Sequence, residues 1–250
     1  MRSPVPARIV SPSLVAGFAG ETSAWGRPGT PLMIEIGCGN GHFLEEYAAL
    51  YPGTDCLGID LRIKRVEKSC RKADRKGLSN LRFMLGDAFA ILAGMPPGVL
   101  ADRIAVNFPD PWPKYRHRDN RLNRSEAIAA MLARISPGGD FVWVCDYYPQ
   151  IVDVLARMQP WLYKGEFENV HGWEGYGEGL EGYPRTLYEK RWRAMGRRIY
   201  YLRFVRRQDS LSGEQSPARA SAIQDMVGGG SGCGKGASVS AAGQDAPDLL

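Results

Sequence analysis

A carboxylate enclosed by prolines is the feature of this chain with the clearest chemical potential. Asp110 lies in the run Asn107-Phe108-Pro109-Asp110-Pro111-Trp112-Pro113-Lys114, directly after an apolar segment. Each proline fixes its own φ and restrains the residue before it toward extended geometry, so Phe108, Asp110 and Trp112 are predicted to lose much of their conformational freedom. A preorganised loop with a carboxylate, an indole and an ammonium group is suited to hold a planar, aromatic substrate.

A glycine-rich turn is the second element that could do chemistry. Glu35-Ile36-Gly37-Cys38-Gly39-Asn40-Gly41 follows an apolar run and leads into a helical pattern, which is how backbone N–H groups usually meet a nucleotide-like cofactor. His42 stands where a dinucleotide-binding fingerprint needs its third glycine, so a nicotinamide cofactor is disfavoured. Gly37 and Gly39 are therefore predicted to approach another adenosine-containing ligand, and Glu35 is placed to reach its amino group.

Acidic residues follow two further predicted strands. Asp60 stands 19 residues after Gly41, at a strand end where a carboxylate can accept hydrogen bonds from both hydroxyls of a ribose. Asp87 follows the next predicted strand and could border an adenine. The glycine turn alone could be purely structural, but the acidic residues at strand ends favour a ligand site. The set resembles the S-adenosylmethionine site of class I methyltransferases.

Apolar runs alternate with helical periodicity, which predicts an α/β fold with a doubly wound, mostly parallel seven-stranded sheet. The predicted strands cover 32–36, 54–59, 81–85, 102–108, 140–145, 167–170 and 198–206, and the predicted helices cover 41–50, 62–76, 123–135 and 148–158. The Ser136-Pro137-Gly138-Gly139 segment is expected to end the third helix and to start the next strand at Asp140. Residues 171–184 hold five glycines and are expected to form an irregular excursion.

Composition indicates one globular domain with extensions. The chain has 250 residues, 44% of them hydrophobic, which is enough for a full core. We expect an irregular N-terminal arm over 1–30, one domain over 31–207, and a disordered low-complexity tail over 208–250. No apolar run approaches the roughly 18 residues that span a bilayer, so a soluble, cytoplasmic protein without a membrane partner is expected. The five cysteines are scattered, which disfavours disulfides and a zinc site.

Positive charge is concentrated in the part of the chain predicted to fold. The net charge is +5, but residues 208–250 contribute −3, so residues 1–207 carry +8. Basic residues cluster at 62–76, 114–124 and 185–207, and aromatic residues are interleaved with the last two clusters. Such a surface suits a polyanion with bases that can stack. The cluster at 62–76 is also compatible with a solvated helix face, because its apolar residues form one stripe of Ile63, Val66, Cys70 and Ala73.

Five segments together resemble the tRNA (guanine-N7)-methyltransferase family. They are EIGCGNGHFL at 35–44, GID at 58–60, NLRFMLGDA at 80–88, NFPDPWPKYRHRDNRL at 107–122 and TLYEKRW at 186–192. The resemblance implies a class I methyltransferase (Rossmann-like) domain that uses S-adenosyl-L-methionine as its methyl donor. It also implies tRNA as the partner and methyl transfer to N7 of a guanine in the variable loop, at position forty-six of the tRNA. The chain is expected to act as a monomer or a homodimer.

The resemblance assigns roles to individual residues, and none of them is a metal ligand. Asp110 is the implied catalytic residue. The donor-binding residues are Glu35, Gly37, Gly39, Asp60, Asp87 and Asp110, and the substrate-binding residues are Lys114, Asp146, Thr186, Leu187, Tyr188 and Glu189.

Methylation of guanine N7 needs alignment more than a strong base, because N7 has an in-plane lone pair and no proton at neutral pH. The purine gains positive charge as the sulfonium loses it, and a nearby carboxylate can stabilise that shift. An aspartate has a reference pKa of about 3.9, so Asp110 is expected to be ionised at pH 7. It could act beside the purine or orient the methionine portion of the donor.

Several residues have two interpretations. Trp112 could stack on a base or pack its loop against the sheet, and Lys114 could bind phosphate or be an ordinary exposed charge. Asp146 could contact substrate or cap the helix that follows.

The segment after the glycine-rich excursion is assigned mainly by the resemblance. By residue type alone, Thr186 and Glu189 would be a loop residue and a surface charge. Tyr188 and Trp192 are expected to be core residues rather than base-stacking ones.

Two other functions stay open. Asp119 and Asn120 stand where the family pattern has two basic residues, and Cys145 stands where it has a threonine. These departures leave a methyltransferase of a protein or small molecule, or a noncatalytic RNA-binding relative, as alternatives.

Overall fold

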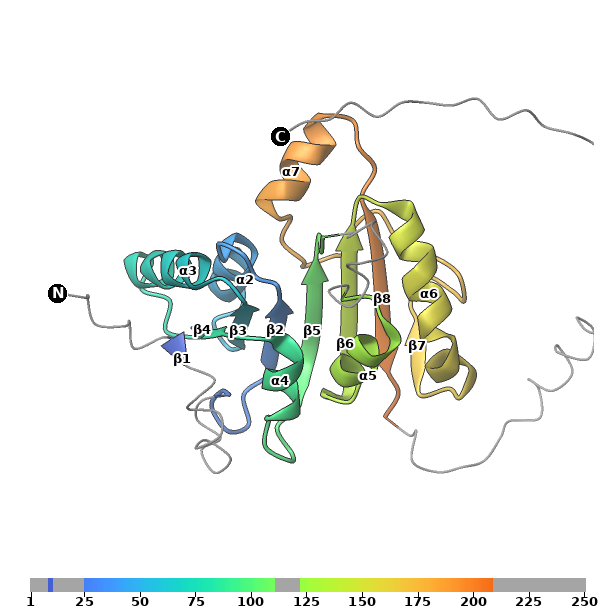
Figure 1. Cartoon of the computed structure of the whole chain (residues 1–250), viewed down its shortest axis with the longest axis horizontal. Helices are drawn as coiled ribbons and strands as arrows, with labels where there is room; N and C mark the ends of the chain where they lie inside the picture. The colour runs from blue at the N-terminus through green and yellow to red at the C-terminus, as the bar shows by residue number, and fades with distance from the viewer. Residues whose placement is uncertain (1–8, 11–24, 111–121, 209–250) are drawn as a thin grey trace, which may run out of the picture. The chain divides into compact units, whose positions relative to one another are not determined.

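The computed structural model describes residues 9–10, 25–110 and 122–208, and a single mixed sheet runs through them (Figure 1). Its strands are β1 (Ile9–Val10), β2 (Leu32–Ile36), β3 (Asp55–Asp60), β4 (Leu81–Leu85), β5 (Ala101–Asn107), β6 (Ile135–Cys145), β7 (Phe167–Asn169) and β8 (Tyr200–Arg206). Their order is β1-β4-β3-β2-β5-β6-β8-β7. β8 runs antiparallel to both of its neighbours, and the other neighbouring pairs are parallel.

The strand order confirms the predicted doubly wound, mostly parallel sheet. From β2 the chain moves outward through β3 and β4, and it then returns to the other side of β2 to form β5. The gap beyond the carboxyl ends of β2 and β5 is the place where open α/β sheets bind ligands, because the connections leave these strands in opposite directions. The seven predicted strands are all present, and the two-residue β1 is an additional one.

Helices cover both faces of the sheet. They are α2 (His42–Leu50), α3 (Ile63–Arg75), α4 (Ala88–Ala93), α5 (Ser125–Leu132), α6 (Tyr148–Tyr163) and α7 (Leu187–Ala194). α2 and α3 contribute Phe43 and Val66 to one apolar cluster, and α4, α5 and α6 contribute to the other. In β2, Ile34 and Ile36 belong to one cluster and Met33 to the other, because successive side chains of a strand point to opposite faces.

The predicted helix over 123–135 and the turn after it are partly wrong. α5 ends at Leu132, and the 136–139 segment lies inside β6. Ala101 pairs with Ile135 and Arg103 with Asp140, so the four residues between are accommodated as an irregularity of the β5–β6 pairing. Gly138 has a φ of 81°, which glycine adopts at little cost. The proline and glycines therefore mark an irregular strand rather than the end of a helix.

Helices at three other places differ from the prediction. α6 continues to Tyr163 past Pro160, because Leu162 is buried in the core and Pro160 falls in the last turn. α4 and α7 are short helices that hydrophobic periodicity did not predict. Figure 1 shows α7 beyond the arrowhead end of β5. Residues 171–184 contain no helix or strand apart from a bridge between Gly177 and Tyr201, as expected for an irregular excursion.

Parts of the predicted arm and tail fall outside the described residues. Within the arm only 9–10 and 25–30 are described, and within the tail only residue 208. In the part of the chain that is described, no helix is both long and apolar enough to cross a membrane. The same residues contain no group of three His, Cys, Asp or Glu side chains that could hold a metal ion.

Candidate active site

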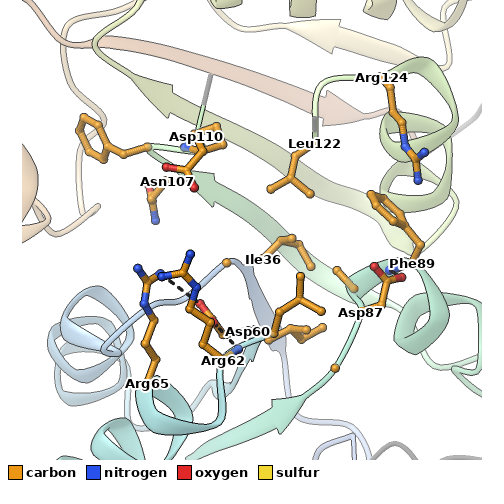
Figure 2. Close-up of a pocket in the computed structure, with 17 residues that line it drawn as sticks. Ile36, Asp60, Arg62, Arg65, Asp87, Phe89, Asn107, Asp110, Leu122 and Arg124 are labelled. Atoms are coloured by element: carbon orange, nitrogen blue, oxygen red, sulfur yellow. Dashed lines mark hydrogen bonds and ion pairs between the residues drawn. The ribbon is translucent and has the colours of Figure 1, made fainter. Parts of the chain in front are cut away.

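A pocket opens at the carboxyl ends of β2, β3 and β5, where the sheet order reverses (Figure 2). Its volume of about 430 Å³ is in the range of small-molecule sites. Apolar side chains, three carboxylates and three guanidinium groups line it. The lining residues are Ile36, Gly37, Ile59, Asp60, Leu61, Arg62, Arg65, Gly86, Asp87, Ala88, Phe89, Asn107, Phe108, Pro109, Asp110, Leu122 and Arg124.

Three of the predicted acidic residues meet at this pocket. Asp60, Asp87 and Asp110 all line it, although Asp60 ends β3, Asp87 follows β4 and Asp110 follows β5. Figure 2 shows Asp110 and Asn107 on one side of the pocket, Asp60 across from them, and Asp87 toward another end. Parallel strands bring their carboxyl ends to one sheet edge, which is why residues far apart in the chain converge here.

Glu35 lies behind the pocket wall rather than in it. The residue is 3% exposed, and its Oε1 accepts a hydrogen bond of 2.8 Å from Asn107 Nδ2. Its Oε2 is buried without a hydrogen-bond partner among the described residues. Burial raises the pKa of Glu35 to about 8, while the Asn107 hydrogen bond lowers it and the charge of Asp60 raises it. A ligand cation at Oε2 would satisfy this oxygen and favour the ionised carboxylate.

Asp60 ties the glycine-rich turn to the start of α3. Its Oδ2 accepts from the Gly39 N–H at 2.9 Å, and its Oδ1 accepts from the Arg62 N–H at 2.8 Å. Arg65 Nη1 lies 3.8 Å from Oδ2. Each carboxylate oxygen can accept more than one hydrogen bond, so a buried Asp60 in the pocket wall can still meet hydroxyl groups of a ligand.

Asp87 has a structural role that the sequence analysis missed. Its Oδ1 accepts from the N–H groups of Phe89 and Ala90, each at 3.0 Å, and so caps the N-terminus of α4. The cap fixes one carboxylate oxygen, while the exposed residue stays in the pocket wall.

The glycine-rich turn leaves room for a ligand but uses its own N–H groups. The N–H groups of Gly37 and Cys38 donate to the Ile59 carbonyl at 2.8 and 3.1 Å, and that of Gly39 donates to Asp60. These N–H groups are therefore already paired within the protein, and contact of Gly37 and Gly39 with the donor stays a prediction. A methyl group added at Gly37 or Gly39 would meet no other atom within 4 Å, so the missing side chains keep this side open.

The start of the proline-rich loop differs from the extended geometry that was predicted. β5 ends at Asn107, and Phe108 has a φ of 48°, which costs energy for a residue with a side chain. Its N–H donates to Val144 O at 2.7 Å, and its ring lies 4.8 Å from the ring of Tyr188. These contacts outweigh the local preference before a proline. Asp110 is exposed in the pocket wall, whereas Trp112 and Lys114 lie outside the described residues.

Asp146 does not cap α6, so the capping interpretation is wrong. The N-cap of α6 is Tyr147, without a side-chain hydrogen bond. Asp146 Oδ2 instead accepts from Arg197 Nη1 at 3.1 Å, and the Arg197 guanidinium lies 4.1 Å from the centroid of the Trp192 ring. Substrate contact by Asp146 stays a prediction.

The 186–189 segment begins α7 instead of forming a loop. Thr186 Oγ1 accepts from the Glu189 N–H at 3.0 Å and caps the helix. Leu187 and Tyr188 are 52% and 44% exposed, so the prediction that Tyr188 is a core residue is wrong. Trp192, in contrast, is partly buried against the apolar cluster of α2 and α3.

Glu189 is a buried anchor of α7 and not a surface charge. It is 0% exposed, its Oε2 accepts from the Tyr201 hydroxyl at 2.5 Å, and its Oε1 accepts from Arg193 Nε at 2.7 Å. The threonine and glutamate three residues apart form a capping-box pattern, which is the signal that could have found this helix. Contact of Thr186, Leu187, Tyr188 or Glu189 with substrate stays a prediction.

Two residues connected to the pocket were not singled out from the sequence. Asn107 is in the wall, and the Tyr183 hydroxyl donates to Asn107 Oδ1 at 2.8 Å. Asn107 stands at a strand end, as the predicted carboxylates do, and could have been found by the same rule. Tyr183 comes from the glycine-rich excursion, and nothing local in the sequence indicates its contact.

The sheet order, with one antiparallel strand near its edge, and the pocket at the reversal point define the class I, Rossmann-like methyltransferases. Residues 29–202 match the profile of a family described as "Putative methyltransferase". The chain is 37% identical to a tRNA (guanine-N(7)-)-methyltransferase of Geobacter metallireducens over 175 residues. The aligned residues cover 70% of this chain and 81% of that protein. The chain belongs to the tRNA (guanine-N(7)-)-methyltransferase family, and it is therefore an enzyme of the methyltransferase class.

Two further comparisons agree with this family and fold. A tRNA (guanine-N(7)-)-methyltransferase of Nitrobacter hamburgensis is 32% identical over 198 residues, which cover 78% of this chain and 75% of that protein. Among solved structures, the 16S rRNA methyltransferase KamB has a TM-score of 0.51 and 20% identity over 71% of this chain and 88% of that chain. The likeness to KamB shows the fold alone.

Proposed function

We propose that this chain transfers the methyl group of S-adenosylmethionine to N7 of a guanine in the variable loop of tRNA. The observation that carries the proposal is the convergence of Asp60, Asp87 and Asp110 on one pocket, with the unpartnered oxygen of Glu35 behind its wall. The activity is assigned to residues 31–207, the part of the chain that the family match at 29–202 covers almost entirely.

The pocket residues fit this donor by their chemistry. Asp60 and Asp87 line the pocket, where Asp60 would accept from the ribose hydroxyls and Asp87 would border the adenine. The open side at Gly37 would admit the ligand close to the backbone. In its ionised form Glu35 requires a hydrogen-bond donor or cation at Oε2, and the ammonium group of an amino acid provides one. Bound S-adenosylmethionine supplies an electrophilic methyl group on a sulfonium centre.

Asp110 is the residue proposed to act on the reacting atoms. Its carboxylate lies in the pocket wall opposite Asp60, where it can stabilise the positive charge that develops on the purine. Guanine N7 is not protonated at neutral pH, so no general base is required. The strained Phe108 and the adjacent Pro109 restrain the start of the loop. Asp110 therefore loses little conformational freedom when the substrate binds.

The surface charge supports tRNA as the substrate. Lysine and arginine contacts to phosphates supply most of the nonspecific affinity of proteins for nucleic acids. Arg62 and Arg65 in the pocket wall continue into an exposed basic face of α3 that carries Lys64, Lys68, Arg71 and Arg75. A polyanion that lies along α3 would therefore bring a base to the pocket.

The proposal is tested with purified protein, labelled S-adenosylmethionine and unmodified tRNA. We expect one methyl group per tRNA and chain cleavage at the variable-loop guanine after chemical treatment specific for 7-methylguanine. A matched transcript with 7-deazaguanine at that position lacks only the accepting nitrogen and should take up no label. Equal labelling of the two transcripts would exclude N7 as the acceptor, and absence of labelling in both would exclude tRNA as the substrate.

A further inference from the structure

A chain of hydrogen bonds leads from the glycine-rich excursion to the carboxylate behind the pocket. The Tyr183 hydroxyl donates to Asn107 Oδ1 at 2.8 Å, and Asn107 Nδ2 donates to Glu35 Oε1 at 2.8 Å. The three residues come from the excursion, β5 and β2, so the chain crosses from an irregular segment into the centre of the sheet. Only Asn107 lines the pocket.

The tyrosine and the amide in this series of hydrogen bonds are each held in one orientation. Tyr183 is 6% exposed, with its ring centroid 4.6 Å from that of Phe43 and 5.7 Å from the Arg103 guanidinium carbon. Its hydroxyl therefore has a fixed position. A side-chain amide that accepts on one side and donates on the other cannot rotate by half a turn without losing the bond to the carboxylate.

The amide orientation decides which Glu35 oxygen stays open. Because Asn107 Nδ2 occupies Oε1, the buried Oε2 is the atom left without a partner. Asp60 raises the pKa of Glu35, and Glu35 in turn raises the pKa values of Cys38, Cys56 and Tyr183; none of these four groups is a cation. No described residue pairs with Oε2, so a cationic group of a bound ligand can complete this site.

We infer that Tyr183 is a positioning residue for the methyl donor: its hydroxyl sets the Asn107 amide, and the amide holds the Glu35 carboxylate with its open oxygen toward the donor's ammonium group. The inference rests on the proposed function, since it takes S-adenosylmethionine as the ligand. It assigns the hydroxyl to donor affinity and not to the methyl-transfer step.

The test compares two tyrosine variants by calorimetric binding of S-adenosylmethionine. Tyr183→Phe keeps the ring but removes the hydroxyl, and it should weaken donor binding about fivefold, with the rate at saturating donor and tRNA unchanged. Tyr51→Phe is the matched control, because the Tyr51 hydroxyl donates at 2.6 Å to the carbonyl of Gly182, next to Tyr183, without touching Asn107. The control should bind donor as the wild type does.

Two further measurements separate positioning from a general loss of structure. Binding of 5′-methylthioadenosine, which lacks the amino-acid portion, should be the same in wild type and Tyr183→Phe. The double variant Tyr183→Phe with Asn107→Ala should bind S-adenosylmethionine no more weakly than Asn107→Ala alone, because the hydroxyl acts only through the amide.

The inference is overturned if Tyr183→Phe binds the donor with wild-type affinity, if Tyr51→Phe weakens it equally, or if the two substitutions add in the double variant. A wild-type protein that binds 5′-methylthioadenosine but not S-adenosylmethionine would also overturn it. Failure of the proposed function can be distinguished from failure of this inference. If tRNA stays unmethylated while Tyr183→Phe still weakens donor binding, only the proposed methyl transfer to tRNA is contradicted.

Discussion

Binding of the methyl donor should release a proton from Glu35. Burial raises the pKa of this carboxyl to about 8, and an ammonium group at Oε2 would require the ionised form. At that pKa, about one molecule in ten carries an ionised Glu35 at pH 7 and about one in a hundred at pH 6. Apparent affinity scales with the fraction of the binding-competent form, so the donor should bind about tenfold more tightly at pH 7 than at pH 6.

Titration calorimetry in two buffers with different ionisation enthalpies measures both the dissociation constant and the protons released. We expect close to one proton per donor at pH 6 and pH 7. Glu35→Gln should bind more weakly at pH 7, with no dependence on pH over this interval and no proton release. 5′-Methylthioadenosine serves as the control ligand, since it has no ammonium group. Equal donor affinity at the two pH values, without proton release, would refute the reasoning.

Three further predictions concern catalysis, the open side of the pocket and the anchor of α7. Asp110→Asn should lower the single-turnover rate at saturating donor about a hundredfold, and a wild-type rate would rule out its proposed role. Gly37→Ala should weaken donor binding at least tenfold. Gly29→Ala is the matched control and should leave binding unchanged, because Gly29 also has a φ of 72° and no atom within 4 Å of an added methyl group but does not line the pocket. Equal binding by both would show that the Gly37 side is not used. Glu189→Gln should lower the free energy of unfolding, measured in urea, by about 3 kcal/mol. The control Glu168→Gln changes an exposed glutamate and should lower it by less than about 0.5 kcal/mol. Equal losses in the two variants would contradict the role of Glu189 as a buried anchor.

Local sequence signals predicted the sheet and two acidic residues that line the pocket. Strand ends and glycines are recognisable over a few residues, and the parallel arrangement then brings Asp60 and Asp87 to one edge without further information. The same signals failed where a residue's role depends on distant contacts. Glu189 looks like a surface charge within its own helix, and only Tyr201 from β8 shows that it is buried.

The sequence by itself determined that the sheet is doubly wound, where the glycine-rich turn lies, and which acidic residues stand at strand ends. Each of these features depends on hydrophobic periodicity or on neighbouring residues in the chain. The tertiary structure alone decided the orientation of Glu35, since its partner Asn107 is 72 residues away and Tyr183 is a further 76 residues along the chain. It also decided the conformation of Phe108, whose N–H and ring are held by β6 and α7. Contacts over such separations form only when the sheet and its connections have closed around them.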